Sequence, residues 1–265
     1  MIDLSTALVR CSRLSVIMTN IKSPELTKGH LTFCKQLHRE LRWGRKPQIK
    51  SKYLEKGLLQ EEDAITLLSR FKKILLNKNE EKLTNSFLSG TPDIYLGESI
   101  RKADIGYDTK CSWSVDTFPF LDDELDDSYF FQNHGYMALT GAHSWTTAFC
   151  LVNAPGHQVL NEKFSLKGRF NYSELDTAYI EGCKEIEKNM IYDMDQFMKD
   201  NPHFDLHNEK WEYDIPMNER VIEFKVKRDD NIIDKMYERV KLVRKELIRL
   251  SGRTIAKEAF ELVEH

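Results

Sequence analysis

The sequence predicts an α/β fold with a central mixed β-sheet flanked by helices, and three observations support this class. Residues 86–114 carry the alternation and turn residues of a β-hairpin followed by a further strand, with the turn at Gly97-Glu98. The next regular element is a helix, SYFFQNHGYMALTG, and a strongly apolar strand, TTAFCLVNAP, follows it. This order of strand, strand, helix and strand is typical of an α/β core.

Before the strands, residues 52–76 have the pattern of one amphipathic helix. Its apolar face is formed by Leu54, Leu58, Ile65 and Leu68, widened by Ala64, Phe71 and Leu75. Glu61 falls on the centre of this apolar stripe. An acid directed into a core is costly unless something pairs with it, and a metal ion would do so. The alternative is that Glu61 lies at the edge of the stripe and reaches solvent.

After the apolar strand, the sequence predicts a C-terminal extension of helices and one strand. Residues 173–201 form a long amphipathic pattern ended by Pro202, residues 219–229 alternate like an edge strand, and residues 231–250 form a helix that stops near Gly252. The expected organisation is a single domain over residues 1–265. Its core covers about residues 12–155 and the extension about residues 156–265. Apart from the helical pattern at residues 173–201, residues 156–218 stay unassigned.

Composition excludes several classes of protein. The chain has 265 residues, of which 41% are hydrophobic and 31% charged, and its formal net charge is −3. No apolar run approaches the roughly 20 residues of a membrane span, and the N-terminus lacks the pattern of a signal peptide. The five cysteines are scattered singly, which argues against clustered zinc or iron–sulfur sites and fits a reducing cytoplasm.

The strongest functional signal lies in GTPDIYLGESIRKADIGYDTK, residues 90–110. Asp93 follows a proline on a turn, and Asp108-Thr109-Lys110 comes 15 residues later on a neighbouring strand. Two carboxylates at adjacent strand ends can share a divalent cation, and the Lys110 ammonium can steady or deprotonate an attacking water. Two other acid-x-Lys triplets, at residues 80–82 and 223–225, have no such aspartate upstream. The pattern therefore predicts metal-assisted phosphodiester hydrolysis.

Two polar side chains on the following helix extend this signal. Gln132 and Tyr136 lie four residues apart and therefore share one helix face. That face would present an amide and a hydroxyl to a phosphate. The alternative is a partly buried helix in which the two side chains make ordinary hydrogen bonds.

Positive charge is concentrated between Arg39 and Lys56. A phosphate-tracking patch with an aromatic side chain for stacking is one reading of this segment, and a solvated charged loop is the other. Its candidate DNA-binding residues are Arg39, Arg42, Trp43, Arg45, Lys46, Lys50 and Lys52.

Taken in order, these motifs resemble a known family. Gly57-x-x-x-Glu61, Gly-Thr-Pro-Asp93, Asp108-Thr-Lys110 and Gln132-x-x-x-Tyr136 are similar to the motifs of the PD-(D/E)xK nuclease superfamily. More narrowly, they resemble the viral-recombinase branch that contains phage lambda exonuclease and the YqaJ-type proteins. The resemblance runs from about residue 12 to residue 155 and implies a restriction-endonuclease-like core.

The resemblance also implies roles for individual residues. Asp93, Asp108 and the Thr109 carbonyl would hold a catalytic Mg²⁺, for which Mn²⁺ would substitute, and Lys110 would position or activate water. Glu61 would support metal binding, while Gln132 and Tyr136 would lie near the scissile phosphate. One departure is that Asp108 stands where the lambda-like branch often has glutamate, which leaves rate and metal preference open.

The activity that the resemblance implies is processive 5′→3′ digestion of linear double-stranded DNA in recombination or repair. A single-strand annealing protein would be the partner, and a ring-shaped homo-oligomer is compatible with the resemblance. Two alternatives stay open. One is an endonuclease of the same superfamily, and the other is a DNA-binding protein that kept the fold and lost catalysis.

Overall fold

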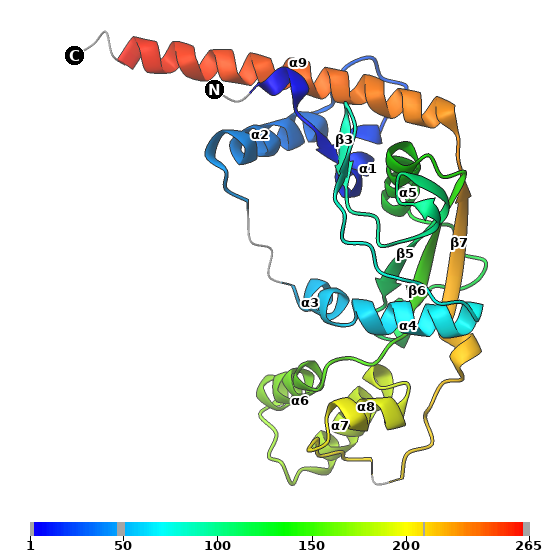
Figure 1. Cartoon of the computed structure of the whole chain (residues 1–265). Helices are drawn as coiled ribbons and strands as arrows, with labels where there is room; N and C mark the ends of the chain where they lie inside the picture. Colours follow the sequence, from blue (N-terminus) through cyan, green and yellow to red (C-terminus); the bar gives the residue numbers. More distant parts are fainter. Residues whose placement is uncertain (1–2, 47–50, 209, 262–265) are drawn as a thin grey trace.

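The computed structural model describes residues 3–46, 51–208 and 210–261, with residues 253–261 described by their backbone alone. Its centre is a four-stranded sheet with the order β4-β5-β6-β7 (Figure 1). The strands are β4 (Ile94–Ser99), β5 (Lys102–Cys111), β6 (Ser144–Cys150) and β7 (Val221–Lys227). β5 and β6 are parallel, whereas the other two neighbouring pairs are antiparallel. The predicted mixed sheet is therefore confirmed, and β7 is an edge strand as its alternation predicts.

A second, three-stranded sheet lies near the N-terminus and was not expected from the sequence. Its order is β1-β3-β2, formed by β1 (Val9–Arg10), β3 (Leu88–Gly90) and β2 (Leu83–Thr84). The prediction of one continuous hairpin strand from residue 86 onward is wrong, because these residues form two strands, β3 and β4, which belong to different sheets. Pro92, which cannot donate to a strand ladder, lies between them. The turn between β4 and β5 also falls at residues 100–101, later than Gly97-Glu98.

Helices cover both faces of the central sheet (Figure 1). On one side, a large apolar cluster joins α1 (Leu14–Met18), α2 (Lys28–Trp43), α5 (Asp127–Thr140) and α9 (Asp230–Glu261) to the sheet. On the other side, α4 (Glu61–Lys72) packs against side chains of β4, β5 and β6. The last strand and helix of the predicted extension thus share the sheet and the apolar cluster of the N-terminal part.

The predictions for residues 52–76 and for the last helix need correction. Residues 52–76 form two helices, α3 (Lys52–Leu59) and α4, because Gln60 has φ −107° and ψ 11° and interrupts the helical backbone. Glu61 is consequently the first residue of α4, where it shares a helix face with the buried Ala64, Ile65 and Leu68, and its side chain is 25% exposed. The last helix does not stop near Gly252 but continues to Glu261.

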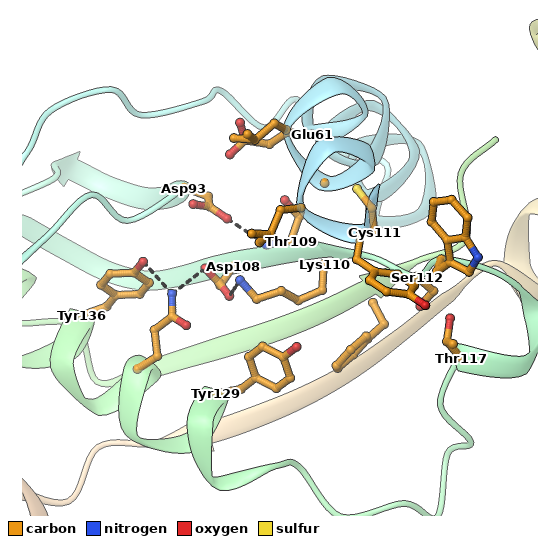
Figure 2. A pocket seen from close by; sticks show the side chains of 17 residues that line it. Glu61, Asp93, Asp108, Thr109, Lys110, Cys111, Ser112, Thr117, Tyr129 and Tyr136 are labelled. Atoms are coloured by element: carbon orange, nitrogen blue, oxygen red, sulfur yellow. Dashed lines mark hydrogen bonds and ion pairs between the residues drawn. The ribbon is translucent and has the colours of Figure 1, made fainter. Parts of the chain in front are cut away.

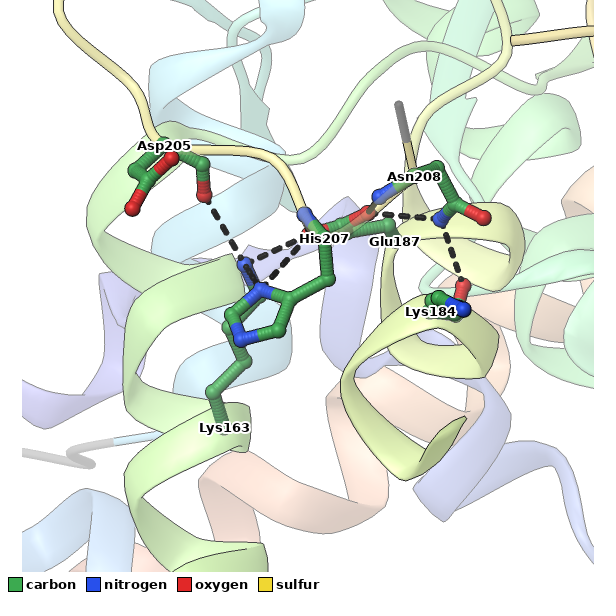
Figure 3. Close-up of polar contacts among 6 residues, drawn as sticks. All are labelled: Lys163, Lys184, Glu187, Asp205, His207 and Asn208. Carbon is green, nitrogen blue, oxygen red and sulfur yellow. Dashed lines mark hydrogen bonds and ion pairs between the residues drawn. The ribbon is translucent and has the colours of Figure 1, made fainter. Parts of the chain in front are cut away.

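A helical lobe fills the segment that the sequence left mostly unassigned. It consists of α6 (Gly156–Phe170), α7 (Thr177–Met190) and α8 (Met194–Asp200), so the single helix predicted over residues 173–201 is wrong. The lobe encloses a buried ion pair between Lys163 Nζ and Glu187 Oε1 at 2.6 Å (Figure 3). Glu187 also accepts hydrogen bonds from the backbone N–H groups of His207 and Asn208, which tie the following loop to α6 and α7.

The described residues also form four short 3₁₀ helices: Leu4–Thr6, Cys11–Arg13, Val115–Thr117 and Met217–Glu219. None of the helices in the described part of the chain combines the length and the apolar character that a membrane span requires.

Candidate active site

A cavity of about 500 Å³ opens where α3, the start of α4, β5 and α5 come together (Figure 2). All seven residues predicted to act in catalysis or metal binding line it: Glu61, Asp93, Asp108, Thr109, Lys110, Gln132 and Tyr136. These residues come from four separate elements or turns. The tertiary fold therefore brings the whole ordered set of motifs to one place.

The two aspartates lie side by side because of strand register. Asp93 immediately precedes β4, in which Ile94 pairs with Tyr107, so Asp93 is placed next to Asp108 on β5. The turn that carries Asp93 is held by Asn79, whose side chain donates to Pro92 O at 2.8 Å and whose backbone N–H donates to Asp93 O at 2.7 Å. The Thr109 N–H donates to Asp93 Oδ2 at 3.1 Å.

Burial and the neighbouring charge of Asp108 raise the pKa of Asp93 well above its usual range. Asp108 is only 1% exposed. When two carboxylates lie in one desolvated site, ionising both at the same time is unfavourable. This electrostatic cost is what a bound cation would relieve.

Lys110 lies on the same face of β5 as Asp108, two residues along the strand, and the two side chains form an ion pair. Burial lowers the pKa of Lys110, but the carboxylates of Asp108 and Asp93 outweigh it, so its pKa is raised overall. The Lys110 ammonium also lies 5.4 Å from the ring centroid of Tyr129 on α5. Lys110 is therefore a cation at neutral pH, held between acids and an aromatic face.

Tyr136 projects from α5 toward the aspartates (Figure 2), and Gln132 on the same helix lines the same cavity. Gln132 Nε2 donates to Tyr136 Oη at 2.8 Å and lies 3.5 Å from Asp108 Oδ1. Burial, together with the charges of Asp108 and Asp93, raises the pKa of Tyr136 well above its usual value, so its hydroxyl keeps its proton. Gly90 allows the ring to approach, because a Cβ there would lie 2.9 Å from Tyr136 Cε1.

Glu61 reaches the cavity from the first turn of α4, but its carboxylate is engaged elsewhere. Lys78 Nζ lies 2.6 Å from Glu61 Oε2. The part of the chain that the structure describes contains no group of three or more His, Cys, Asp or Glu side chains arranged to hold a metal ion.

The remaining donors still fit a hard divalent cation. The Lys110 ammonium pairs with the buried Oδ2 of Asp108, whereas among the described residues Oδ1 has only the long 3.5 Å contact with the Gln132 amide. Mg²⁺ is commonly bound by one or two carboxylates and completes its shell with water and phosphate oxygens. Asp93 and Asp108, with the Thr109 carbonyl, are a donor set of this kind.

The structure leaves most of the predicted DNA-binding residues on the surface. Arg39, Arg42, Trp43, Arg45 and Lys46 are exposed at and beyond the end of α2, with Trp43 60% exposed. Lys52 forms an ion pair with Glu162 at 2.7 Å. Lys50 lies outside the described residues.

Lys56, the last residue of the basic segment, is not available to DNA. It is fully buried and donates from Nζ to Ser112 O at 2.7 Å and to Trp113 O at 3.0 Å. The basic segment therefore contains one lysine that stabilises the end of β5.

Sequence reasoning also missed part of the cavity wall. Leu54 and Leu58 were predicted to be core, yet they are 53% and 78% exposed and line the cavity with Tyr53. Trp113 lines it as well, and its ring packs edge-on against Tyr53 with centroids 5.2 Å apart. High exposure of apolar residues on a short helix cannot be read from periodicity, because the same pattern describes a buried face.

Solved structures share this fold over almost the whole chain. A phage-related exonuclease from Haemophilus somnus 129PT is 26% identical, with a TM-score of 0.69 over 95% of this chain and 98% of that one. An alkaline exonuclease (LHK-Exo) from Laribacter hongkongensis is 13% identical with a TM-score of 0.55, and 14% identical in its complex with dAMP at the same TM-score. Each LHK-Exo likeness covers 97% of this chain and 96% of that chain. No protein-family model and no curated protein matches the sequence.

The fold and the cavity define the class of protein: the chain is similar to nucleases of the PD-(D/E)xK superfamily, with a restriction-endonuclease-like core. Within that class it is similar to phage-related and alkaline exonucleases, which confirms the resemblance predicted from the motifs. These likenesses support a nuclease enzyme.

Proposed function

We propose that the chain is a metal-dependent DNA exonuclease that hydrolyses phosphodiester bonds of linear double-stranded DNA from the 5′ end, in recombination or repair. The observation that carries this proposal is the meeting of Asp93, Asp108 and Lys110 in one cavity, on the fold of known exonucleases. Phosphodiester hydrolysis needs negative ligands for a cation and a positive group near the developing charge, and these three residues supply both.

Each residue has a task that follows from its position. Asp93 and Asp108, with the Thr109 carbonyl, would hold Mg²⁺. Such an ion neutralises phosphoryl charge and lowers the pKa of a bound water when present. Lys110, an ammonium next to Asp108, donates hydrogen bonds to water or to a phosphate oxygen and so orients the nucleophile.

Gln132 and Tyr136 form the opposite wall. The hydroxyl of Tyr136 accepts from Gln132, so its own proton is left to point toward a phosphate oxygen. The Gln132 amide lies near Asp108 Oδ1 and restrains the orientation of that carboxylate. Both side chains are buried, and the water exclusion that follows strengthens these electrostatic interactions.

The exposed residues at the end of α2 support a path for the duplex. Arg39, Arg45 and Lys46 would contact phosphates without reading bases, and Trp43 offers a face on which a base can stack. Contacts of this kind hold DNA of any sequence, as a processive exonuclease requires.

The test uses end-labelled linear duplex and covalently closed circular duplex, each incubated in Mg²⁺ with the wild-type protein and with Asp108→Ala. Loss of the linear DNA alone, abolished in the variant, is the expected result, and labelling the 5′ and 3′ ends separately determines the polarity. Cutting of the circle would make the protein an endonuclease. No cleavage in Mg²⁺ or Mn²⁺, with duplex binding retained, would leave a DNA-binding protein on a nuclease fold.

A further inference from the structure

Lys78, which pairs with Glu61, lies in a segment whose backbone contacts the turn that carries Asp93. The backbone of Lys78 forms an antiparallel bridge with Ile94, the residue that follows Asp93. The next residue, Asn79, donates from its backbone N–H to the Asp93 carbonyl. Lys78 is thus anchored beside the aspartate turn, and only its side chain reaches across to α4.

The carboxylate that Lys78 holds is close enough to matter to the aspartates. Glu61 lines the same cavity as Asp93 and Asp108, and its charge contributes to raising the pKa of Asp93. Its Oε2, however, lies 2.6 Å from Lys78 Nζ. A carboxylate oxygen paired with an ammonium at this distance is a weakened ligand, because the cation would have to displace a charge-assisted hydrogen bond.

We propose that Lys78 is a positioning residue that holds Glu61 away from the cation held by Asp93 and Asp108, so that Glu61 becomes a ligand only when this ion pair is broken. The inference rests on the proposed metal-dependent function. According to this inference, the Lys78 side chain is the reason that the Glu61 carboxylate is not a third ligand of the cation.

The size of the effect follows from the exposure of the pair. The side chains of Lys78 and Glu61 are 34% and 25% exposed, which places the pair between surface and interior. Exposed ion pairs change an equilibrium by up to about fivefold, and a partly buried pair lies at the upper end of that range. Removing the ammonium should therefore tighten divalent-cation binding by about fivefold.

The chain offers a matched control. Lys72 Nζ pairs with Glu223 Oε2 at 3.0 Å, with side-chain exposures of 29% and 24%, and neither residue lines the cavity. Removing Lys72 deletes an equivalent positive charge from α4 without releasing Glu61. The comparison separates a specific effect at Glu61 from a general loss of positive charge.

The experiment is calorimetric titration of Mn²⁺ into the full-length wild type, Lys78→Met, Lys72→Met, Glu61→Gln, the double variant Lys78→Met/Glu61→Gln, and Asp108→Asn as the reference for loss of a ligand. Lys78→Met is expected to bind Mn²⁺ about fivefold more tightly than Lys72→Met. The double variant should lose that gain, and Glu61→Gln alone should bind like the wild type. Lys78→Gln repeats the test if Lys78→Met does not fold.

Equal affinities for Lys78→Met and Lys72→Met would overturn the inference, as would a gain that persists in the double variant. A loss of affinity in Glu61→Gln as large as that in Asp108→Asn would show that Glu61 is already a ligand and would overturn it too. If the wild type does not bind Mn²⁺, or binds it no more tightly than Asp108→Asn does, the proposed metal-dependent function fails together with the inference. The other outcomes overturn the inference alone.

Discussion

Replacing Lys56 with methionine should change how the stability of the protein depends on pH. Lys56 is fully buried, and its Nζ donates to the carbonyls of Ser112 and Trp113 and lies 5.6 Å from the Tyr192 ring centroid. Among the described residues it has no carboxylate within ion-pair distance. Methionine has a similar shape and no charge, so the substitution removes the ammonium and leaves the packing nearly unchanged.

The magnitude follows from the pKa of the buried amine. Burial lowers the pKa of Lys56 from 10.5 to about 8. Because the unfolded chain binds more protons than the folded chain between these two values, the stability of the wild type rises with pH across this window. Below pH 8 the whole cost of the buried charge, about 3 kcal/mol, is present. Between pH 7.5 and pH 10 about 2 kcal/mol of it should be relieved.

Lys56→Met has no amine to deprotonate, so its stability lacks this rise with pH. The substitution also leaves the carbonyl oxygens of Ser112 and Trp113 without their donor. That loss costs about 1–3 kcal/mol at any pH. Near neutral pH the lost hydrogen bonds and the removed charge therefore offset each other. At pH 10 the variant should be less stable, relative to the wild type, by about 2 kcal/mol more than at pH 7.5.

The measurement is urea unfolding of the wild type and Lys56→Met at both pH values, followed by tryptophan fluorescence. Other titrating groups are common to both proteins, so they cancel in the difference. Lys52→Met removes a lysine from an exposed position of the same helix and serves as the control. A stability difference between wild type and Lys56→Met that is the same at pH 7.5 and pH 10 would refute this reasoning.

Three further predictions concern packing, the helical lobe and DNA contact. Gly106→Ala should destabilise the protein by about 1–3 kcal/mol in urea, because a Cβ there would lie 2.1 Å from Trp145 Cη2; unchanged stability would contradict the strand packing. Glu187→Gln should cost about 3–5 kcal/mol, since it leaves the Lys163 ammonium buried without its counter-charge, and a nearly neutral variant would contradict this. Arg39→Gln should reduce the slope of log affinity against log salt by about one in duplex-binding titrations without metal, and an unchanged slope would place Arg39 away from the DNA.

Much of the core could be predicted because the signals are local. The strand segments of β5 and β7 and the helix that ends at Gly141 are indicated by neighbours a few residues apart, and the structure has all three elements. Two of the predictions that failed concern interruptions of a helix. Gln60 breaks a continuous apolar pattern, and residues 191–193 separate α7 from α8, although neither position carries a glycine or proline that would indicate a break.

The candidate site likewise has features that local sequence patterns predict and features that only the fold decides. The order of Asp93, Asp108 and Lys110 along the chain, with Gln132 and Tyr136 four residues apart on the next helix, predicts the chemistry and carries the resemblance to a nuclease family. Residue type and short spacing are sufficient for this, because strand and helix periodicity decide which side chains share a face.

Only the tertiary structure decided which charges meet. Lys78 pairs with Glu61 across 17 positions of the chain, and Lys56 is buried beneath Ser112 and Trp113 instead of facing DNA. Nothing local distinguishes these two lysines from the exposed ones around them. Electrostatic energy depends on distance and burial in the folded molecule, and separation along the sequence determines neither.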